Sequence, residues 1–239
     1  MSAIWVVRHG QASFLAENYD RLSPLGERQA RLLGEHWLAA GVAFDRVYYG
    51  PAERQIRTGE IIGDLYKQAG RSWPEPAVDP DLDEFPFEPL VRRFLPELMA
   101  RHPHLAATVA QFQAATGAGP KQRLFDRVLR DVSQRWMSGE VGTPDLPSWP
   151  DFCHRVEEAV ARIREAAPKS SRMGVFTSGG PTAATARAAL RLSYEATLEL
   201  TWSPRNASVS EFLSTQGRFS LSTFNSTPHL PDASLLTYR

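Results

Sequence analysis

Hydrophobic and polar residues follow two periods along this chain, and each period predicts one kind of element. An uninterrupted apolar run at residues 4–7 predicts a buried strand near the start of the sequence. Similar short runs, bounded by glycine, proline and polar residues, predict strands at residues 42–49, 77–79, 173–177, 208–214 and 219–224. The last two runs alternate as edge strands do, with a short turn at residues 215–217 between them.

Apolar residues three or four positions apart predict helices between these strands. The clearest start lies at Ser23, which we expect to cap a helix that has Pro24 at its first position and ends at Gly41. The same spacing predicts helices at residues 52–69, 152–167 and 182–190. Prolines interrupt residues 74–89, and helical spacing returns over residues 90–142 with a hinge at residues 117–120.

Strands that alternate with helices are typical of a parallel sheet covered on both faces. The pattern therefore predicts the α/β class, as a three-layer α/β/α sandwich with a mostly parallel central sheet. We expect a single domain over residues 1–239 with a helical cap insertion at about residues 85–150. At 239 residues, the chain is long enough to bury a sizeable core.

The composition narrows the classes of partner. Lysine and arginine (27) balance aspartate and glutamate (27), which argues against nucleic acid or an anionic membrane as a bulk partner. Cys153 is the single cysteine, so neither an internal disulfide nor a cysteine-based zinc site is expected. No apolar run has the length of a membrane span or of a secretory signal, and we expect a cytoplasmic protein. The oligomeric state is left open.

Candidate chemistry lies where the predicted strands end, because ligands of α/β proteins bind at the carboxyl edge of the sheet. Arg8, His9 and Gly10 follow the first strand, and Arg54 and Arg57 follow the second at the start of a helix. A single histidine is more often structural than catalytic, and an arginine pair is as often solvated as functional. Guanidinium groups at a helix amino terminus are nevertheless suited to phosphate.

Glu84 follows the third predicted strand, in the segment Leu82-Asp83-Glu84-Phe85-Pro86. A carboxylic acid beside apolar residues can hold a proton for a leaving group, although most carboxylates merely lie at the surface. Two arginines, one imidazole and one carboxylic acid at successive strand ends are the groups that phosphoryl transfer through a phosphohistidine requires.

Several ordered motifs together resemble the histidine phosphatase superfamily, in its phosphoglycerate mutase-like branch. They are Val7-Arg8-His9-Gly10, the segment from Ser23 to Ala30, the segment from Gly50 to Thr58, Leu82-Asp83-Glu84, Phe176-Thr177-Ser178-Gly179-Gly180 and, in the tail, Asn206-Ala207-Ser208-Val209 and the segment from Phe224 to Leu230. Each motif is weak alone, but their order and spacing make a strong combined signal.

The resemblance implies a role for each matching residue. His9 is expected to take the phosphoryl group, Arg8 and Arg54 to bind its oxygens, and Glu84 to protonate the departing alkoxide. Neighbouring guanidinium charges are expected to keep the imidazole neutral. The implied activity is metal-independent hydrolysis of a small phosphorylated substrate, by a phosphomonoesterase of the histidine acid phosphatase type, with no cofactor.

One position departs from the family pattern. Members usually carry a second histidine after the later strand, whereas this chain has Ser178. A hydroxyl is shorter than an imidazole and carries no positive charge, so we expect reduced activity. Ser178 and Gly179 remain candidates for phosphate binding, since the backbone N–H groups of this turn open a helix.

Two other readings follow from the same turn. A non-catalytic or weakly active phospho-ligand-binding relative of the phosphatases agrees with the change at Ser178, although it gives no reason for His9 and Glu84 to be retained. A serine hydrolase with Ser178 as nucleophile is less favoured, because Phe176 occupies the first glycine position of the nucleophile-elbow motif.

Overall fold

The structure is a computed structural model that describes residues 1–12, 20–142 and 145–238. It divides into two compact units, one formed by Met1–Glu84 with Cys153–Arg239 and the other by Phe85–Phe152. In the described ranges no helix combines the length and the apolar character needed to cross a bilayer. The prediction of a single domain with an insertion stays a prediction.

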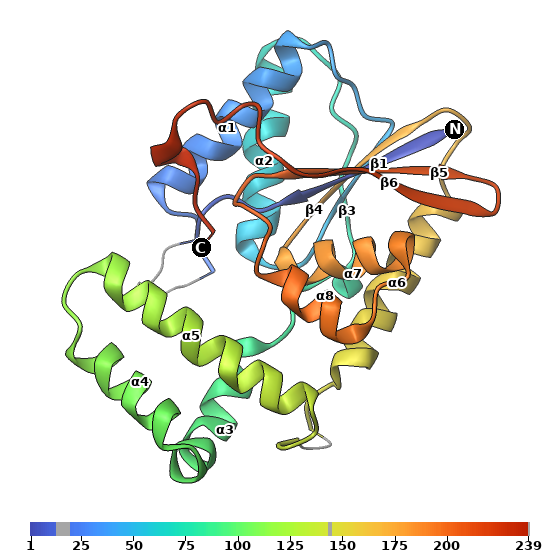
Figure 1. Ribbon diagram of the computed structural model, residues 1–239. Helices are drawn as coiled ribbons and strands as arrows, with labels where there is room; N and C mark the ends of the chain where they lie inside the picture. Colours follow the sequence, from blue (N-terminus) through green and yellow to red (C-terminus); the bar gives the residue numbers. More distant parts are fainter. Residues whose placement is uncertain (13–19, 143–144, 239) are drawn as a thin grey trace. The chain divides into compact units, whose positions relative to one another are not determined.

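The first unit contains a six-stranded sheet (Figure 1). Its strands are β1 (Ser2–Arg8), β2 (Arg46–Tyr49), β3 (Ala77–Val78), β4 (Arg172–Thr177), β5 (Val209–Thr215) and β6 (Arg218–Ser226). The order across the sheet is β3-β2-β4-β1-β5-β6, in which β3, β2, β4 and β1 are parallel and β5 and β6 pair antiparallel. The predicted mostly parallel sheet is confirmed.

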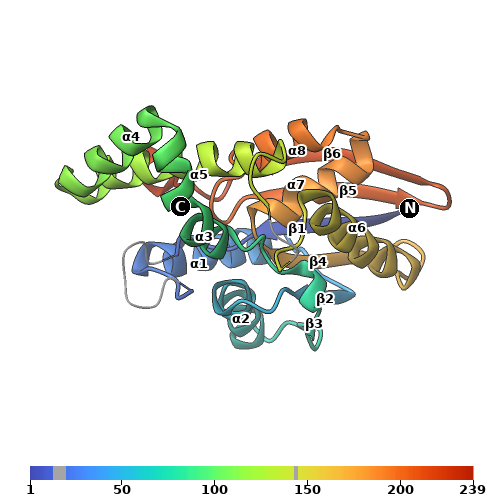
Figure 2. The ribbon, with the colours of Figure 1, turned by 90° about the horizontal axis from the view of Figure 1, so that it is seen from below.

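Helices cover both faces of this sheet, as Figure 2 shows from below. On one face lie α1 (Pro24–Ala39) and α2 (Glu53–Gln68), and on the other lie α7 (Gly179–Leu190) and α8 (Tyr194–Thr201). The remaining elements of this unit are the short 3₁₀ turns η1 (Pro80–Leu82) and η2 (Ala233–Leu235) and the part of α6 (Trp149–Glu165) from Cys153 onward. The predicted three-layer α/β/α class is therefore confirmed.

One cluster of large buried side chains of this unit lies between the sheet and the α1/α2 layer. One core cluster joins β1, β2 and β4 to these two helices through Val7, Leu33, Trp37, Phe44, Val47, Tyr49, Ile62, Tyr66 and Phe176. Ser23 caps α1 as expected, because its hydroxyl accepts the N–H of Gly26 at 3.0 Å. The packed core holds the strand ends rigid, which a site at this edge requires.

The second unit is helical, with α3 (Phe87–Arg101), α4 (Pro103–Ala114), α5 (Ala118–Met137) and the first residues of α6. The expected hinge near Gly117 separates α4 from α5, and Gly117 has φ 84°. The break between α3 and α4 was missed: α3 ends at Arg101 and Pro103 is the first residue of α4, a position that favours proline. As predicted, no long helix runs through the proline-rich residues 74–89: α3 begins at Phe87, and Pro89 lies in its first turn, where proline is tolerated.

Two further expectations about elements differ from the structure. The second strand begins at Arg46 rather than at Val42, because the N–H of Val42 bonds to Trp37 O and closes the end of α1. Helix α8 was not predicted. It has eight residues, and its signal is a Ser193 cap rather than a long apolar stripe.

Candidate active site at the carboxyl edge of the sheet

Strands β1 and β4 bring two candidate residues next to each other. They pair in parallel register, with Arg8 opposite Thr177, and the N–H of His9 donates to Thr177 O at 2.8 Å. His9 and Ser178 therefore leave the sheet side by side at the same edge. β2 ends at this edge as well, since the N–H of Gly50 donates to Phe176 O at 2.9 Å.

The ring of His9 is held in one tautomer. Its side chain is buried, and Nδ1 lies 2.6 Å from Gly10 O. Because a carbonyl oxygen only accepts, Nδ1 carries the proton. The other ring nitrogen, Nε2, lies 3.2 Å from Nε of Arg54, and the N–H of Arg54 donates to it. Nε2 is therefore unprotonated and keeps the lone pair that a nucleophile needs.

The surroundings of His9 also keep the ring uncharged. Burial is the main cause of a pKa well below the ordinary value of 6.5, and the positive charges of Arg54 and Arg8 lower it further. The bond to Gly10 O acts in the opposite direction. The two arginines lower the pKa of His9, as predicted from the sequence. Burial lowers it more, and the prediction from the sequence did not include burial. His9 is neutral at pH 7.

The backbone of His9 is fixed by residues from distant parts of the chain. Its carbonyl oxygen accepts from Asn206 Nδ2 at 3.2 Å and from the N–H of Ala207 at 3.1 Å. The N–H of Gly10 donates to Thr58 Oγ1 at 3.0 Å. Asn206 was known only as part of the tail motif, and nothing in the local sequence indicated this contact.

Arg54 lies in the first turn of α2, as its position after the second strand predicted. Its Nη1 contacts Asp20 Oδ1 at 2.5 Å, while Asp20 Oδ2 accepts the N–H of Glu53 at 2.8 Å. One carboxylate thus binds both the guanidinium and the start of the helix, where an anion is favoured. Asp20 was missed by the sequence argument, because a lone aspartate before α1 carries no recognisable pattern.

Arg8 is buried and lies near the turn that begins α7. Its Nη1 donates to Pro204 O. A Cβ atom placed on Gly179 would lie 3.8–3.9 Å from the guanidinium and 2.9 Å from Thr201 O. Glycine at this position therefore allows α7 and α8 to approach closely, whereas the Arg8 guanidinium lies at an ordinary van der Waals distance.

Glu84 reaches the same turn from the other side. Its Oε2 accepts the N–H of Gly180 at 3.2 Å. Its segment is held by two bonds, from Thr177 Oγ1 to Leu82 O at 2.6 Å and from Arg155 Nη2 to Asp83 O at 2.9 Å. Strands β1 and β4 and the segment after η1 thus bring His9, Arg8, Glu84 and Ser178 to one edge, and α2 adds Arg54.

Arg57, the other arginine of the Gly50–Thr58 segment, does not join this group. Arg57 is half-exposed and pairs with Glu60 and Glu27 at 3.5 and 3.8 Å. In the Phe85–Phe152 unit, His102 and His104 bond to carboxylates of that unit, at 2.6 and 2.8 Å.

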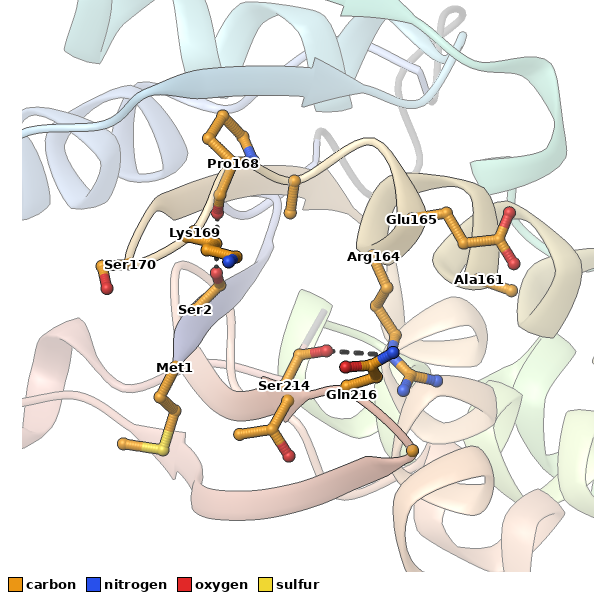
Figure 3. Close-up of a pocket in the computed structure, with 13 residues that line it drawn as sticks. Met1, Ser2, Ala161, Arg164, Glu165, Pro168, Lys169, Ser170, Ser214 and Gln216 are labelled. Carbon is orange, nitrogen blue, oxygen red and sulfur yellow. Dashed lines mark hydrogen bonds between the residues drawn. The ribbon is translucent and has the colours of Figure 1, made fainter.

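A separate cleft of about 600 Å³ lies at the opposite end of the sheet (Figure 3). Its lining includes Ser2, at the start of β1, and Arg164, whose Nε donates to Ser214 Oγ at 3.1 Å. Since β1 runs from Ser2 to Arg8, this cleft is a strand length away from His9. In the described ranges, no group of three or more His, Cys, Asp or Glu side chains is arranged to hold a metal ion.

The sequence matches the model of the histidine phosphatase superfamily (branch 1) over residues 4–139 and 119–227. The chain therefore belongs to this superfamily. Over 75 residues it is 37% identical to a 2,3-bisphosphoglycerate-dependent phosphoglycerate mutase of Caulobacter vibrioides (strain NA1000 / CB15N). That match covers 29% of this chain and 32% of the mutase, so the chain spans about a third of the length of the curated relative.

Solved structures of phosphatases have a similar fold. A phosphoserine phosphatase of Entamoeba histolytica, in complex with 3-phosphoglyceric acid, is 19% identical with a TM-score of 0.62, covering 96% of this chain and 100% of that one. A mycobacterial glucosyl-3-phosphoglycerate phosphatase with inorganic phosphate is 20% identical, again with a TM-score of 0.62 and covering 95% and 98%. These neighbours support the fold, and the superfamily includes both phosphatases and mutases.

A second buried imidazole, that of His229, lies near the segment that holds His9. Its ring centroid is 6.2 Å from that of His36. Burial, with the nearby His36, lowers the pKa of His229 to about 4, and a backbone hydrogen bond with Ala207 acts in the opposite direction. His9 and His229 are both histidines that the fold holds without charge.

We predict that acid destabilises the fold through these rings. His229 titrates near 6.5 in the unfolded chain and near 4 in the folded one, so the unfolded state binds more protons between these values. The free energy of unfolding should fall by about 3 kcal/mol for His229 as the pH drops from 6.5 to 4. Urea unfolding of the wild type and of His229→Leu at several pH values measures this. Equal slopes in the two proteins would contradict it.

Proposed function

We propose that this protein is a phosphatase that hydrolyses small phosphomonoesters through a phosphohistidine at His9. The observation that carries the proposal is the state of the His9 ring, with a proton on Nδ1 and a lone pair on Nε2 beside Arg54. A buried neutral imidazole among cationic groups is suited to attack a phosphorus atom whose oxygens bind those groups. The phosphatases among the structural neighbours agree with this class of reaction.

In the first step, Nε2 attacks phosphorus and the bond from phosphorus to the ester oxygen breaks. Arg54 then donates to a phosphoryl oxygen instead of to Nε2, and Arg8 with the N–H groups of the Ser178–Gly179 turn supplies further donors. The phosphorylated ring is positively charged, and Gly10 O, which accepts from Nδ1, stabilises that charge.

Glu84 is the proposed acid of this step. It gives its proton to the leaving alkoxide, and in the second step it takes a proton from the water that attacks phosphorus. The bond from phosphorus to Nε2 then breaks, which releases inorganic phosphate and restores the neutral ring. Glu84 accepts a hydrogen bond from the N–H of Gly180, which belongs to the same turn as Ser178. The proposed acid therefore lies beside the proposed phosphate site.

We further propose that Ser178 occupies the position where relatives carry a second histidine. This change favours hydrolysis at reduced rate, and it is the one feature that supports a weakly active phosphate-binding protein as a second candidate. Ser178 as a nucleophile lacks support: its hydroxyl bonds to the side-chain amide of Gln55, and an amide does not act as a general base.

The nucleophile is tested by His9→Ala. Turnover of p-nitrophenyl phosphate should fall by about 10⁴-fold or more, because no other group takes the phosphoryl group. Wild type incubated with ³²P-labelled substrate and quenched in alkaline detergent should carry a base-stable, acid-labile label that the variant lacks. His154→Ala, which removes an exposed imidazole of α6, is the matched control and should retain both. Unchanged turnover in a folded His9→Ala protein would overturn the proposal.

The acid is tested by Glu84→Gln with two kinds of leaving group. Alkyl phosphates require a proton on the departing oxygen, so kcat/KM for them should fall by about 10²-fold or more. Nitrophenolate leaves without a proton, and the loss with p-nitrophenyl phosphate should stay below about tenfold. Steady-state kinetics on both esters measures the difference. Equal losses on the two substrates would show that Glu84 is not the acid.

A further inference from the structure

Two consecutive residues of α2 contact the two neighbouring residues that leave the sheet. Nε of Arg54 lies 3.2 Å from Nε2 of His9, and Nε2 of Gln55 lies 2.8 Å from Oγ of Ser178. Because β1 and β4 are adjacent and in register up to Arg8 and Thr177, the contacts lie side by side. Gln55 therefore donates to Ser178, just as the preceding residue, Arg54, donates to His9.

The amide of Gln55 has a defined orientation. Its side chain is completely buried, so both ends of the amide need hydrogen-bond partners. Oε1 accepts the N–H of Ala52 at 3.1 Å, which closes the start of α2. The amide cannot be turned around, because its NH₂ end would then face that N–H. The NH₂ group must therefore point at Ser178.

The local sequence leaves room for this side chain. A Cβ atom on Gly50 would lie 2.1 Å from Oε1 of Gln55, so glycine at the end of β2 is required for the amide to lie where it does. Ser178 is equally buried, and its carbonyl oxygen is bound by the N–H of Thr182 at 3.2 Å and by Thr182 Oγ1 at 2.8 Å. Both partners of the Gln55–Ser178 bond are thus fixed by their own elements.

This bond determines what the hydroxyl of Ser178 can do. Gln55 donates, so Ser178 Oγ accepts and its own proton is not used in the bond. Rotation of the hydroxyl must direct that proton away from the amide. The phosphoryl group proposed for His9, on the neighbouring strand end, carries oxygens that can accept such a proton.

We propose that Gln55 is a positioning residue, which makes the hydroxyl of Ser178 a hydrogen-bond donor to the phosphoryl group. This inference rests on the phosphatase proposed above and adds a residue to it. Gln55 does not touch the reacting atoms; it acts through Ser178. The hydroxyl of Ser178 is a neutral donor that Gln55 holds in one orientation. It supplies part of the stabilisation that a charged donor would give the phosphoryl group at this position.

The experiment is a double-mutant cycle with Gln55→Met and Ser178→Ala. Methionine keeps the length and the approximate volume of the buried side chain but removes the donor to Ser178, together with the acceptor of the Ala52 N–H. The kcat for p-nitrophenyl phosphate and the inhibition constant of inorganic phosphate are measured for the four proteins, with thermal unfolding as the check on folding. Ser178→Ala should lower kcat by about 10- to 100-fold, and Gln55→Met by about tenfold.

The cycle separates positioning from general destabilisation. If Gln55 acts through Ser178, Gln55→Met should change kcat by less than about twofold once residue 178 is alanine, and the inhibition constants should follow the same pattern. Gln29→Met is the matched control: Gln29 is just as buried, but its amide donates to Leu235 O at 2.8 Å. Any effect of that variant should multiply with Ser178→Ala.

The possible failures are distinguishable. If the wild type is active and the losses of kcat in Gln55→Met and Ser178→Ala multiply in the double variant, the role of Gln55 is overturned and the phosphatase proposal stands. A Gln55→Met protein with unchanged kcat and unchanged phosphate inhibition would also overturn the role of Gln55 and leave the phosphatase proposal standing. A wild type that neither hydrolyses p-nitrophenyl phosphate nor is protected by inorganic phosphate against thermal unfolding would overturn the proposed function, and the role of Gln55 with it.

Discussion

The site depends on one short hydrogen bond, from Nδ1 of His9 to the carbonyl oxygen of Gly10, at 2.6 Å. The bond fixes the tautomer of a buried ring and turns the unprotonated nitrogen, Nε2, toward Arg54. Burial disfavours a charged ring before any neighbouring charge is considered. The structure thus holds an imidazole as a neutral base whose unprotonated nitrogen faces a guanidinium group, which is the state that phosphoryl transfer needs.

The sheet explains why the other groups gather around this ring. Parallel strands end at one edge, so residues that are far apart in the sequence leave the core as neighbours. His9 follows β1 and Ser178 follows β4, while Arg54 lies in the first turn of the helix after β2. Asn206, from the tail, binds the carbonyl oxygen of His9 and ties this edge to the end of the chain. Positions are set by rigid elements rather than by a long loop.

The sequence was sufficient to predict the fold class and the strand-end candidates. Those predictions depend on short-range periodicity and on the rule that parallel strands end together, and both are visible in one sequence. The state of His9 was predicted in direction, but from its charged neighbours alone. Its burial, the larger cause, depends on how distant segments pack around it.

Contacts made across the fold were not predictable. Asp20 and Gln55 are polar residues next to helix starts, and such residues usually read as solvated caps or surface groups. Only the structure shows that Gln55 is completely buried and that Gly50 leaves space for it. The break before Pro103 and the short helix α8 were missed for a related reason, because local signals compete with packing.

The most direct test of this account is the ¹⁵N NMR spectrum of the His9 ring as a function of pH. A neutral ring with its proton on Nδ1 should persist from pH 8 to well below the ordinary histidine pKa of 6.5, for as long as the protein stays folded. The assignment of the resonances is made by comparison with His9→Ala. A His9 ring that becomes protonated near pH 6.5, or that carries its proton on Nε2, would contradict the central claim.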